Sequence, residues 1–121
     1  MGHPARILVV EDEAALANLI QRVLGMYDAE GVVLSTPEEA LQMLRDESFD
    51  CLLTDLNLWN SPLSGLDLVS QARETREGIH CVVMSGDVGG VDQKRFQPPL
   101  LTLQKPFGVA ALVAALGLDS A

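Results

Sequence analysis

The chain has 121 residues, a length that leaves no room for a second folded domain. Its hydrophobic fraction of 48% is enough to form one core. Acidic residues outnumber basic residues by 17 to 8, and the resulting net charge of −9 argues against direct binding to the phosphate backbone of nucleic acid. No apolar run approaches the roughly 20 residues that span a bilayer, and no secretory signal is present, so we expect a cytoplasmic protein without membrane contact.

Strands and helices are predicted to alternate from the start of the chain. Residues 6–10 form a β-branched apolar run typical of a buried parallel strand, and this run stops at Glu11 and Asp12. Apolar residues then recur at helical spacing up to Gly25, which predicts a helix, and residues 31–34 predict the second strand.

The second helix is predicted to begin at a capping box. Thr36 offers an N-cap hydroxyl, Pro37 suits the first helical position, and Glu39 follows three residues after the threonine. This combination is a strong start signal for a helix that buries Ala40 and Leu44.

The second half of the chain continues the alternation. Residues 49–54 predict a third strand that ends at Asp55, and residues 66–76 predict a helix. Residues 80–84 predict a fourth strand that ends at Ser85.

The connection after the fourth strand has a different composition. Residues 86–99 contain three glycines and two prolines, so any helix there should be short or frayed. Residues 100–103 predict the fifth strand, which Lys105 and Pro106 follow, and residues 110–116 predict the closing helix.

This order of elements describes a (βα)₅ chain of the α/β class. We expect one domain over residues 1–121, in which residues 1–5 are a flexible N-terminal extension or a remnant of cloning. Right-handed crossovers between alternating strands and helices require a doubly wound, five-stranded parallel sheet with helices on both faces. We expect the flavodoxin-like strand order 2-1-3-4-5, and ligands of such sheets bind at the carboxyl ends of the strands.

The polar residues that end the strands all belong to that edge of the predicted sheet. They are Glu11, Asp12, Asp55, Ser85 and Lys105. Any one of them could be an ordinary helix cap or a solvated side chain, but together they predict a site. Three carboxylates within about 5 Å repel one another by up to a few kcal/mol per pair, so a divalent cation is expected among them. Oxygen ligands favour Mg²⁺.

With its charge screened in this way, Asp55 could attack a phosphoryl group as a nucleophile. Lys105 and the hydroxyl of Ser85 would then bind two of the phosphoryl oxygens, and the metal would bind the third. The site therefore predicts phosphoryl transfer to Asp55.

These residues, in this order and at this spacing, resemble the signature of the response-regulator receiver family, and the resemblance covers nearly the whole chain. It implies that Asp55 is phosphorylated by a partner histidine kinase or phosphotransfer protein and that Ser85 senses the phosphoryl group. It also implies a cis peptide bond between Lys105 and Pro106. The implied ligands of Mg²⁺ are Glu11, Asp12, Asp55 and the main-chain carbonyl of Asn57.

The chain departs from the family pattern in three places. The loop over residues 56–64 is longer than usual and carries Trp59 where a proline is common. Thr102 stands where receivers carry the Tyr or Phe that moves on activation, so the aromatic half of the switch formed with Ser85 is absent. The stretch between Ser85 and Lys105 is also short and rich in glycine and proline.

Two alternatives compete with this prediction. A haloacid-dehalogenase-type phosphatase also uses an aspartyl nucleophile, but it needs a second acid two residues later, where this chain has Asn57. A degenerate receiver could instead act as a phosphorylation-independent binding module, which Thr102 and the unusual loop favour.

The output of the domain is predicted to depend on protein contacts. We expect no enzymatic activity beyond Mg²⁺-dependent self-phosphorylation and self-dephosphorylation. Since the chain ends just after the last predicted helix, we expect either a stand-alone regulator or a receiver from a hybrid kinase. Either one would signal through an as yet unknown downstream protein.

Overall fold

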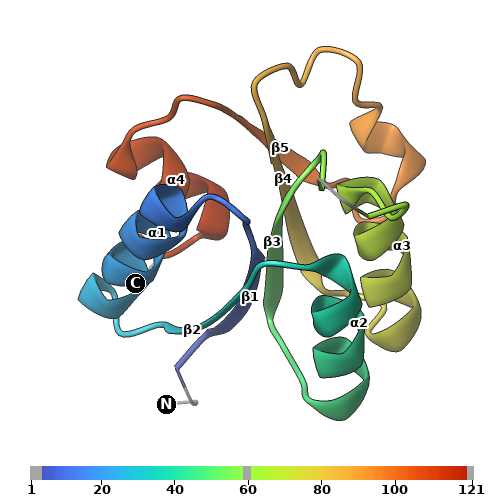
Figure 1. Ribbon diagram of the computed structural model, residues 1–121, viewed down its shortest axis with the longest axis horizontal. Coiled ribbons are helices and arrows are strands. Elements are labelled where there is room, and N and C mark those ends of the chain that lie inside the picture. The colour runs from blue at the N-terminus through green and yellow to red at the C-terminus, as the bar shows by residue number, and fades with distance from the viewer. Residues whose placement is uncertain (1–3, 59–60, 120–121) are drawn as a thin grey trace.

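Five parallel strands form one sheet, and helices cover both of its faces (Figure 1). The computed structural model describes residues 4–58 and 61–119. The strand order is β2-β1-β3-β4-β5, which confirms the predicted doubly wound, flavodoxin-like α/β fold. The strands are β1 Arg6–Val10, β2 Glu30–Leu34, β3 Cys51–Asp55, β4 His80–Ser85 and β5 Leu101–Gln104. The helices are α1 Ala14–Met26, α2 Pro37–Asp46, α3 Gly65–Thr75 and α4 Val109–Leu116.

Each face of the sheet packs against a different pair of helices (Figure 1). Neighbouring residues of β1 show this alternation, because successive side chains of a strand point to opposite faces. Leu8 and Val10 join the core under α2 and α3, whereas Ile7 and Val9 join the core under α1 and α4. The central strands are therefore buried on both faces, as their continuous apolar runs predict.

Helices α2 and α3 both begin at a capping side chain. The predicted capping box at Thr36 forms in part: the Thr36 hydroxyl oxygen accepts from the Glu39 amide at 3.3 Å, but the Glu39 carboxylate accepts the Thr36 hydroxyl proton at 2.8 Å instead of a main-chain N–H. A complete box opens α3, where Ser64 and Asp67 exchange hydrogen bonds of 2.8 and 3.2 Å. The start of α3 is thus fixed immediately after the loop that leaves β3.

The end of one helix differs from that predicted, whereas the fourth crossover agrees with its prediction. The first helix does not end at Gly25 but continues to Met26, because the left-handed residue that turns the chain is Asp28, with φ of 57°. The fourth crossover, among the described residues 86–100, contains only a 3₁₀ helix, Gln93–Arg95, as its glycines and prolines predict.

The connection between β4 and β5 is held in place without an α-helix. Val91 and Phe96 pack against the core on the α3 side of the sheet. Arg73 of α3 donates from Nη1 to the carbonyl oxygen of Pro98 at 2.6 Å, and the Gln97–Pro98 peptide bond is cis. Across the part of the chain that the structure describes, the helices are too short or too polar to cross a membrane.

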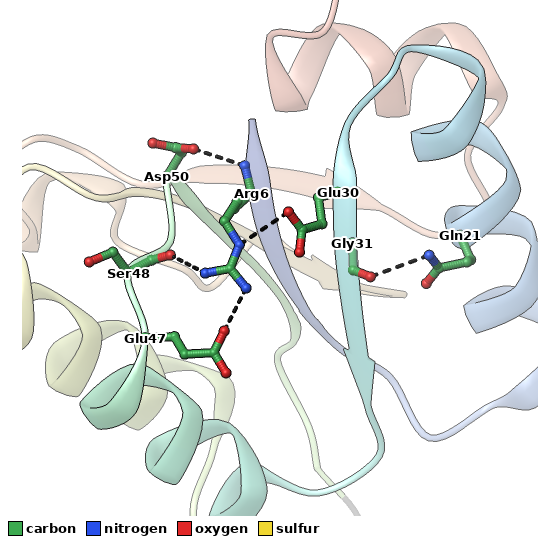
Figure 2. A network of polar contacts seen from close by, with 7 residues as sticks. All are labelled: Arg6, Gln21, Glu30, Gly31, Glu47, Ser48 and Asp50. Carbon is green, nitrogen blue, oxygen red and sulfur yellow. Dashed lines mark hydrogen bonds and ion pairs between the residues drawn. The ribbon is translucent and has the colours of Figure 1, made fainter. Parts of the chain in front are cut away.

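The amino edge of the sheet is organised around Arg6 (Figure 2). Its guanidinium lies 2.6 Å from a Glu47 carboxylate oxygen and 3.4 Å from one of Glu30, and it donates to the carbonyl oxygen of Ser48 at 2.8 Å. Its main-chain N–H donates to Asp50 Oδ2 at 2.8 Å. One arginine thus joins the starts of β1 and β2 to the chain before β3.

Candidate functional site

The carboxyl edge of the sheet gathers the polar residues that end its strands. Glu11 follows β1 and is buried, its neighbour Asp12 is exposed, and Asp55 is the last residue of β3. Ser85 ends β4, and Lys105 follows β5 directly. They line one cavity of about 170 Å³, whose other lining residues are Glu13, Asn57, Met84 and Gly86.

Lys105 bridges the two buried carboxylates of this cavity. Its Nζ lies 2.6 Å from Asp55 Oδ1 and 2.9 Å from Glu11 Oε1. The main-chain N–H of Lys105 donates to the carbonyl oxygen of Ser85 at 2.8 Å, and the peptide bond from Lys105 to Pro106 is cis. The other oxygen of Glu11 accepts from the Glu13 amide at 3.0 Å. Groups from the ends of three strands are therefore joined by one ammonium.

The surroundings shift the pKa values of the two bridged acids in opposite directions. Burial and the neighbouring Glu11 raise the pKa of Asp55 to about 7, against the opposing ion pair with Lys105. Burial also acts to raise the pKa of Glu11, but its contacts with Asp55, the Glu13 amide and Lys105 hold that pKa below its ordinary value. Burial opposes the charge on Lys105, whose two ion pairs nevertheless raise its pKa. Without a bound cation, Asp55 is therefore the member of the pair that takes up a proton near neutral pH.

The donor set fits a hard divalent cation. One oxygen from each of Glu11, Asp12 and Asp55 lies within 4.8 Å of the others. Lys105 supplies one positive charge against these three carboxylates, so a divalent ion would complete the charge balance. Asn57 lines the same cavity, as the resemblance requires of a residue that offers its main-chain carbonyl. Oxygen ligands in this number suit Mg²⁺.

Ser85 and Thr102 lie in different environments. The Ser85 side chain is buried, and its oxygen accepts from the Asp87 amide at 3.2 Å. A hydroxyl that accepts one hydrogen bond can still donate its proton to a ligand oxygen. Thr102 lies within β5, paired with Val83 of β4, and does not line the cavity. The structure therefore brings together the predicted site residues except Thr102. Trp59, which stands where the family commonly has a proline, lies outside the described residues.

Two residues that shape the site were not predicted from the sequence. Glu13 contributes its amide to Glu11 and lines the cavity. Gly65 approaches the end of β3 so closely that an added Cβ would overlap the main-chain oxygen of Asp55. The sequence did contain a signal for Gly65. Glycine is unfavourable in a helix, so a glycine directly after the capping Ser64 indicates that this position has another requirement.

Comparisons with known proteins agree with this architecture. Residues 7–117 match the family model of the response regulator receiver domain. A response regulator receiver protein of Anaeromyxobacter sp. (strain Fw109-5) is 29% identical over 111 residues, which are 89% of this chain and 45% of that protein. This chain thus spans less than half the length of that curated relative.

Solved structures show the same fold. The CheY-like receiver domain from Methylobacillus flagellatus is 26% identical with a TM-score of 0.80, and the match covers 96% of this chain and 99% of that one. The receiver domain of a sensor histidine kinase from Pseudomonas aeruginosa PAO1 is 20% identical with a TM-score of 0.76, covering 93% and 94% of the two chains. That structure has a magnesium ion coordinated in its active site cleft. Since the family model matches nearly the whole chain, this protein belongs to the response regulator receiver domain family.

Proposed function

We propose that this chain is a phosphoacceptor, in which Asp55 takes a phosphoryl group from a histidine kinase or a phosphotransfer protein. The observation that carries this proposal is the position of Lys105, whose Nζ lies 2.6 Å from Asp55 Oδ1 beside the three-acid cluster. Membership of the receiver family supports the same role. We propose no catalysis beyond the chain's own phosphorylation and dephosphorylation.

The proposed reaction exchanges one bond to phosphorus for another. A carboxylate oxygen of Asp55 forms the new bond, and the bond from phosphorus to the donor atom breaks. The donor is a histidine nitrogen or the acyl oxygen of a small molecule, and it leaves with the electron pair of the broken bond. The product is an acyl phosphate on Asp55.

The side chains of the cavity are placed to oppose the charge of the incoming group. The Lys105 ammonium lies beside the attacking carboxylate, so it can stabilise negative charge on a phosphoryl oxygen. Ser85 lines the same cavity, and its hydroxyl can donate to another phosphoryl oxygen. Both groups come from strand ends that the sheet holds rigidly, so little rearrangement is needed.

We assign Glu11, Asp12 and Asp55 as the carboxylate ligands of Mg²⁺, with the main-chain carbonyl of Asn57 as a further ligand. When bound, the ion would act as a Lewis acid on a phosphoryl oxygen and neutralise part of the carboxylate charge. The magnesium ion in the related Pseudomonas aeruginosa domain is consistent with this assignment.

Incubation with acetyl phosphate and Mg²⁺, followed by intact-mass spectrometry, tests the phosphoacceptor function. We expect one adduct of about 80 Da that is labile to base, as an acyl phosphate must be. Asp55→Asn should abolish the adduct, because it removes the attacking anionic oxygen and keeps the side-chain size. Lys105→Ala should slow its formation. Wild-type protein that forms no adduct under saturating Mg²⁺ would contradict the proposal.

A second function is favoured by Thr102 and by the crossover without an α-helix between β4 and β5. These features are expected of a binding module that works without phosphorylation. A partner that binds wild-type protein and Asp55→Asn equally well, combined with no phosphate adduct, would support this second function.

A further inference from the structure

The loop between β3 and α3 is attached to α2 as well as to the sheet. Leu58 of this loop is buried in the core on the α2 and α3 side, and Gly65 donates its N–H to the Leu56 carbonyl oxygen at 2.8 Å, which closes the loop at its base. Farther along, Ser61 Oγ donates to Glu38 Oε2 at 2.8 Å, across 23 positions of sequence. Ser61, in the loop that starts directly after Asp55, is therefore held by Glu38 of α2.

Glu38 is well suited to this contact. It lies in the first turn of α2, where the N-terminus of a helix stabilises negative charge. A hydroxyl bound to a carboxylate makes a stronger hydrogen bond than one bound to a neutral acceptor. The Ser61 oxygen also accepts from the Leu63 amide at 3.1 Å, so the serine is held from two sides. The neighbouring Glu39 is engaged elsewhere, with the Thr36 hydroxyl.

Asn57 connects this contact with the acid site. It lines the cavity that contains Asp55, and it also lines a second cavity of about 320 Å³. The other described residues that line the second cavity belong to the same loop and are Leu58, Ser61, Pro62, Leu63 and Ser64. Asn57 thus lies between the two cavities, and it shares the second cavity with Leu58, which is buried in the core, and with Ser61, which Glu38 holds.

We propose that Glu38 is a positioning residue for the acid site. By holding Ser61, it fixes one wall of the cavity that Asn57 also lines, and thereby strengthens the binding of Mg²⁺. This role rests on the function proposed above, in which the main-chain carbonyl of Asn57 is a metal ligand. It makes α2 part of the site, although no described residue of α2 lines the acid cavity.

The test combines a chemical-shift titration with Mg²⁺ and hydrogen exchange of the loop amides in EDTA. Glu38→Ala and Ser61→Ala each remove one side of the contact, and each should weaken Mg²⁺ binding about three- to tenfold and speed exchange at the amides of residues 61, 63 and 64. The double variant should lose no more than either single variant, because both remove the same bond. Glu38→Gln keeps an acceptor oxygen and should restore most of the affinity.

Glu39→Ala is the matched control, since it removes an acid from the same helical turn without touching Ser61. It should retain the wild-type affinity for Mg²⁺. An equal loss in Glu39→Ala, or in Glu38→Gln, would show that charge and not the contact matters, and would overturn the proposal. Unchanged affinity in both Glu38→Ala and Ser61→Ala would defeat the positioning role alone. A wild-type protein that does not bind Mg²⁺ would instead defeat the proposed function, and this role with it.

Discussion

At each edge of the sheet one basic side chain pairs with two acids, but the charges of these acids are neutralised differently at the two edges. At the amino edge, Glu30 and Glu47 keep 56% and 42% of their side-chain surface exposed, so water screens their charge. Arg6 spreads its donors over both carboxylates and the Ser48 carbonyl oxygen, which the fork of a guanidinium allows (Figure 2). Protein groups and solvent together satisfy this edge.

At the carboxyl edge, Glu11 and Asp55 keep only 1% and 8% of their side-chain surface exposed, so water screens them poorly. The ammonium of Lys105 meets both of them, while Asp12 adds a third carboxylate nearby. Negative charge therefore remains in a place where burial makes it costly. The comparison indicates that burial, more than the number of acids, distinguishes the proposed cation site from an ordinary network of ion pairs.

The largest loss of stability is expected at Gly65, whose backbone lies against the carboxyl end of β3. Gly65→Ala should lower the free energy of unfolding by about 1–3 kcal/mol, because its Cβ would overlap the main-chain oxygen of Asp55. Gly78 at the amino edge is the matched control, since nothing lies within 4 Å of a Cβ added there. Urea denaturation of both variants measures the difference. Equal stability of Gly65→Ala and Gly78→Ala would contradict the close approach.

Substituting Lys105 at one edge and Arg6 at the other should show a further difference between the edges, in the response of stability to Mg²⁺. Lys105→Met should destabilise the metal-free protein by about 1–2 kcal/mol at neutral pH, because it leaves two buried acids without their cation. Mg²⁺ should recover part of this loss by supplying positive charge. Arg6→Met should also destabilise the protein, but Mg²⁺ should not rescue it. Thermal denaturation with Mg²⁺ and with EDTA checks both variants, and rescue of both would break the distinction.

Asp55 should make the stability of the metal-free protein depend on pH, with a smaller effect than the substitutions above. Burial and Glu11 raise its pKa to about 7 in the folded state, whereas the unfolded chain titrates at about 4. The folded state thus binds more protons between these values, and the stability from protonated Asp55 is lost as the pH rises through 7. In EDTA, wild-type protein should lose stability relative to Asp55→Asn on going from pH 5 to pH 8. Parallel pH profiles for the two proteins would disprove this assignment.

The smallest change is expected at two thiols in the interior, Cys51 and Cys81. Both are buried, on opposite faces of the sheet, and burial raises the pKa of each. Neither should react with a thiol reagent in the folded protein, whichever edge variant is studied. Rapid labelling in Lys105→Met or Arg6→Met would mean that the substitution disturbs the core and not one edge.

The fold and the rim of the site could be predicted because both follow from local patterns and from topology. The apolar runs before Asp55 and Ser85 identify strands, and a parallel sheet brings the ends of such strands to one edge. The glycines and prolines after Ser85 likewise predict a short or frayed helix, and only a 3₁₀ helix forms between β4 and β5.

What the sequence did not reveal depends on contacts between distant segments. The hydrogen bond from Ser61 to Glu38 joins residues 23 positions apart, and no local pattern encodes it. The capping-box sequence at Thr36 was recognised, yet the Glu39 carboxylate accepts from the Thr36 hydroxyl and not from the main-chain N–H of Thr36. Such choices are decided by side-chain geometry, which periodicity does not specify.

Titration of the metal-free protein with Mg²⁺ tests the central claim most directly, because it asks whether the carboxyl edge is a cation site and the amino edge is not. Wild-type protein, Asp12→Asn and Glu47→Gln should be compared by isothermal calorimetry, since each variant removes one exposed negative charge from a different edge. We predict saturable binding by wild-type protein, a several-fold loss of affinity in Asp12→Asn and no change in Glu47→Gln. Equal effects of the two substitutions, or no binding by wild-type protein, would contradict the account.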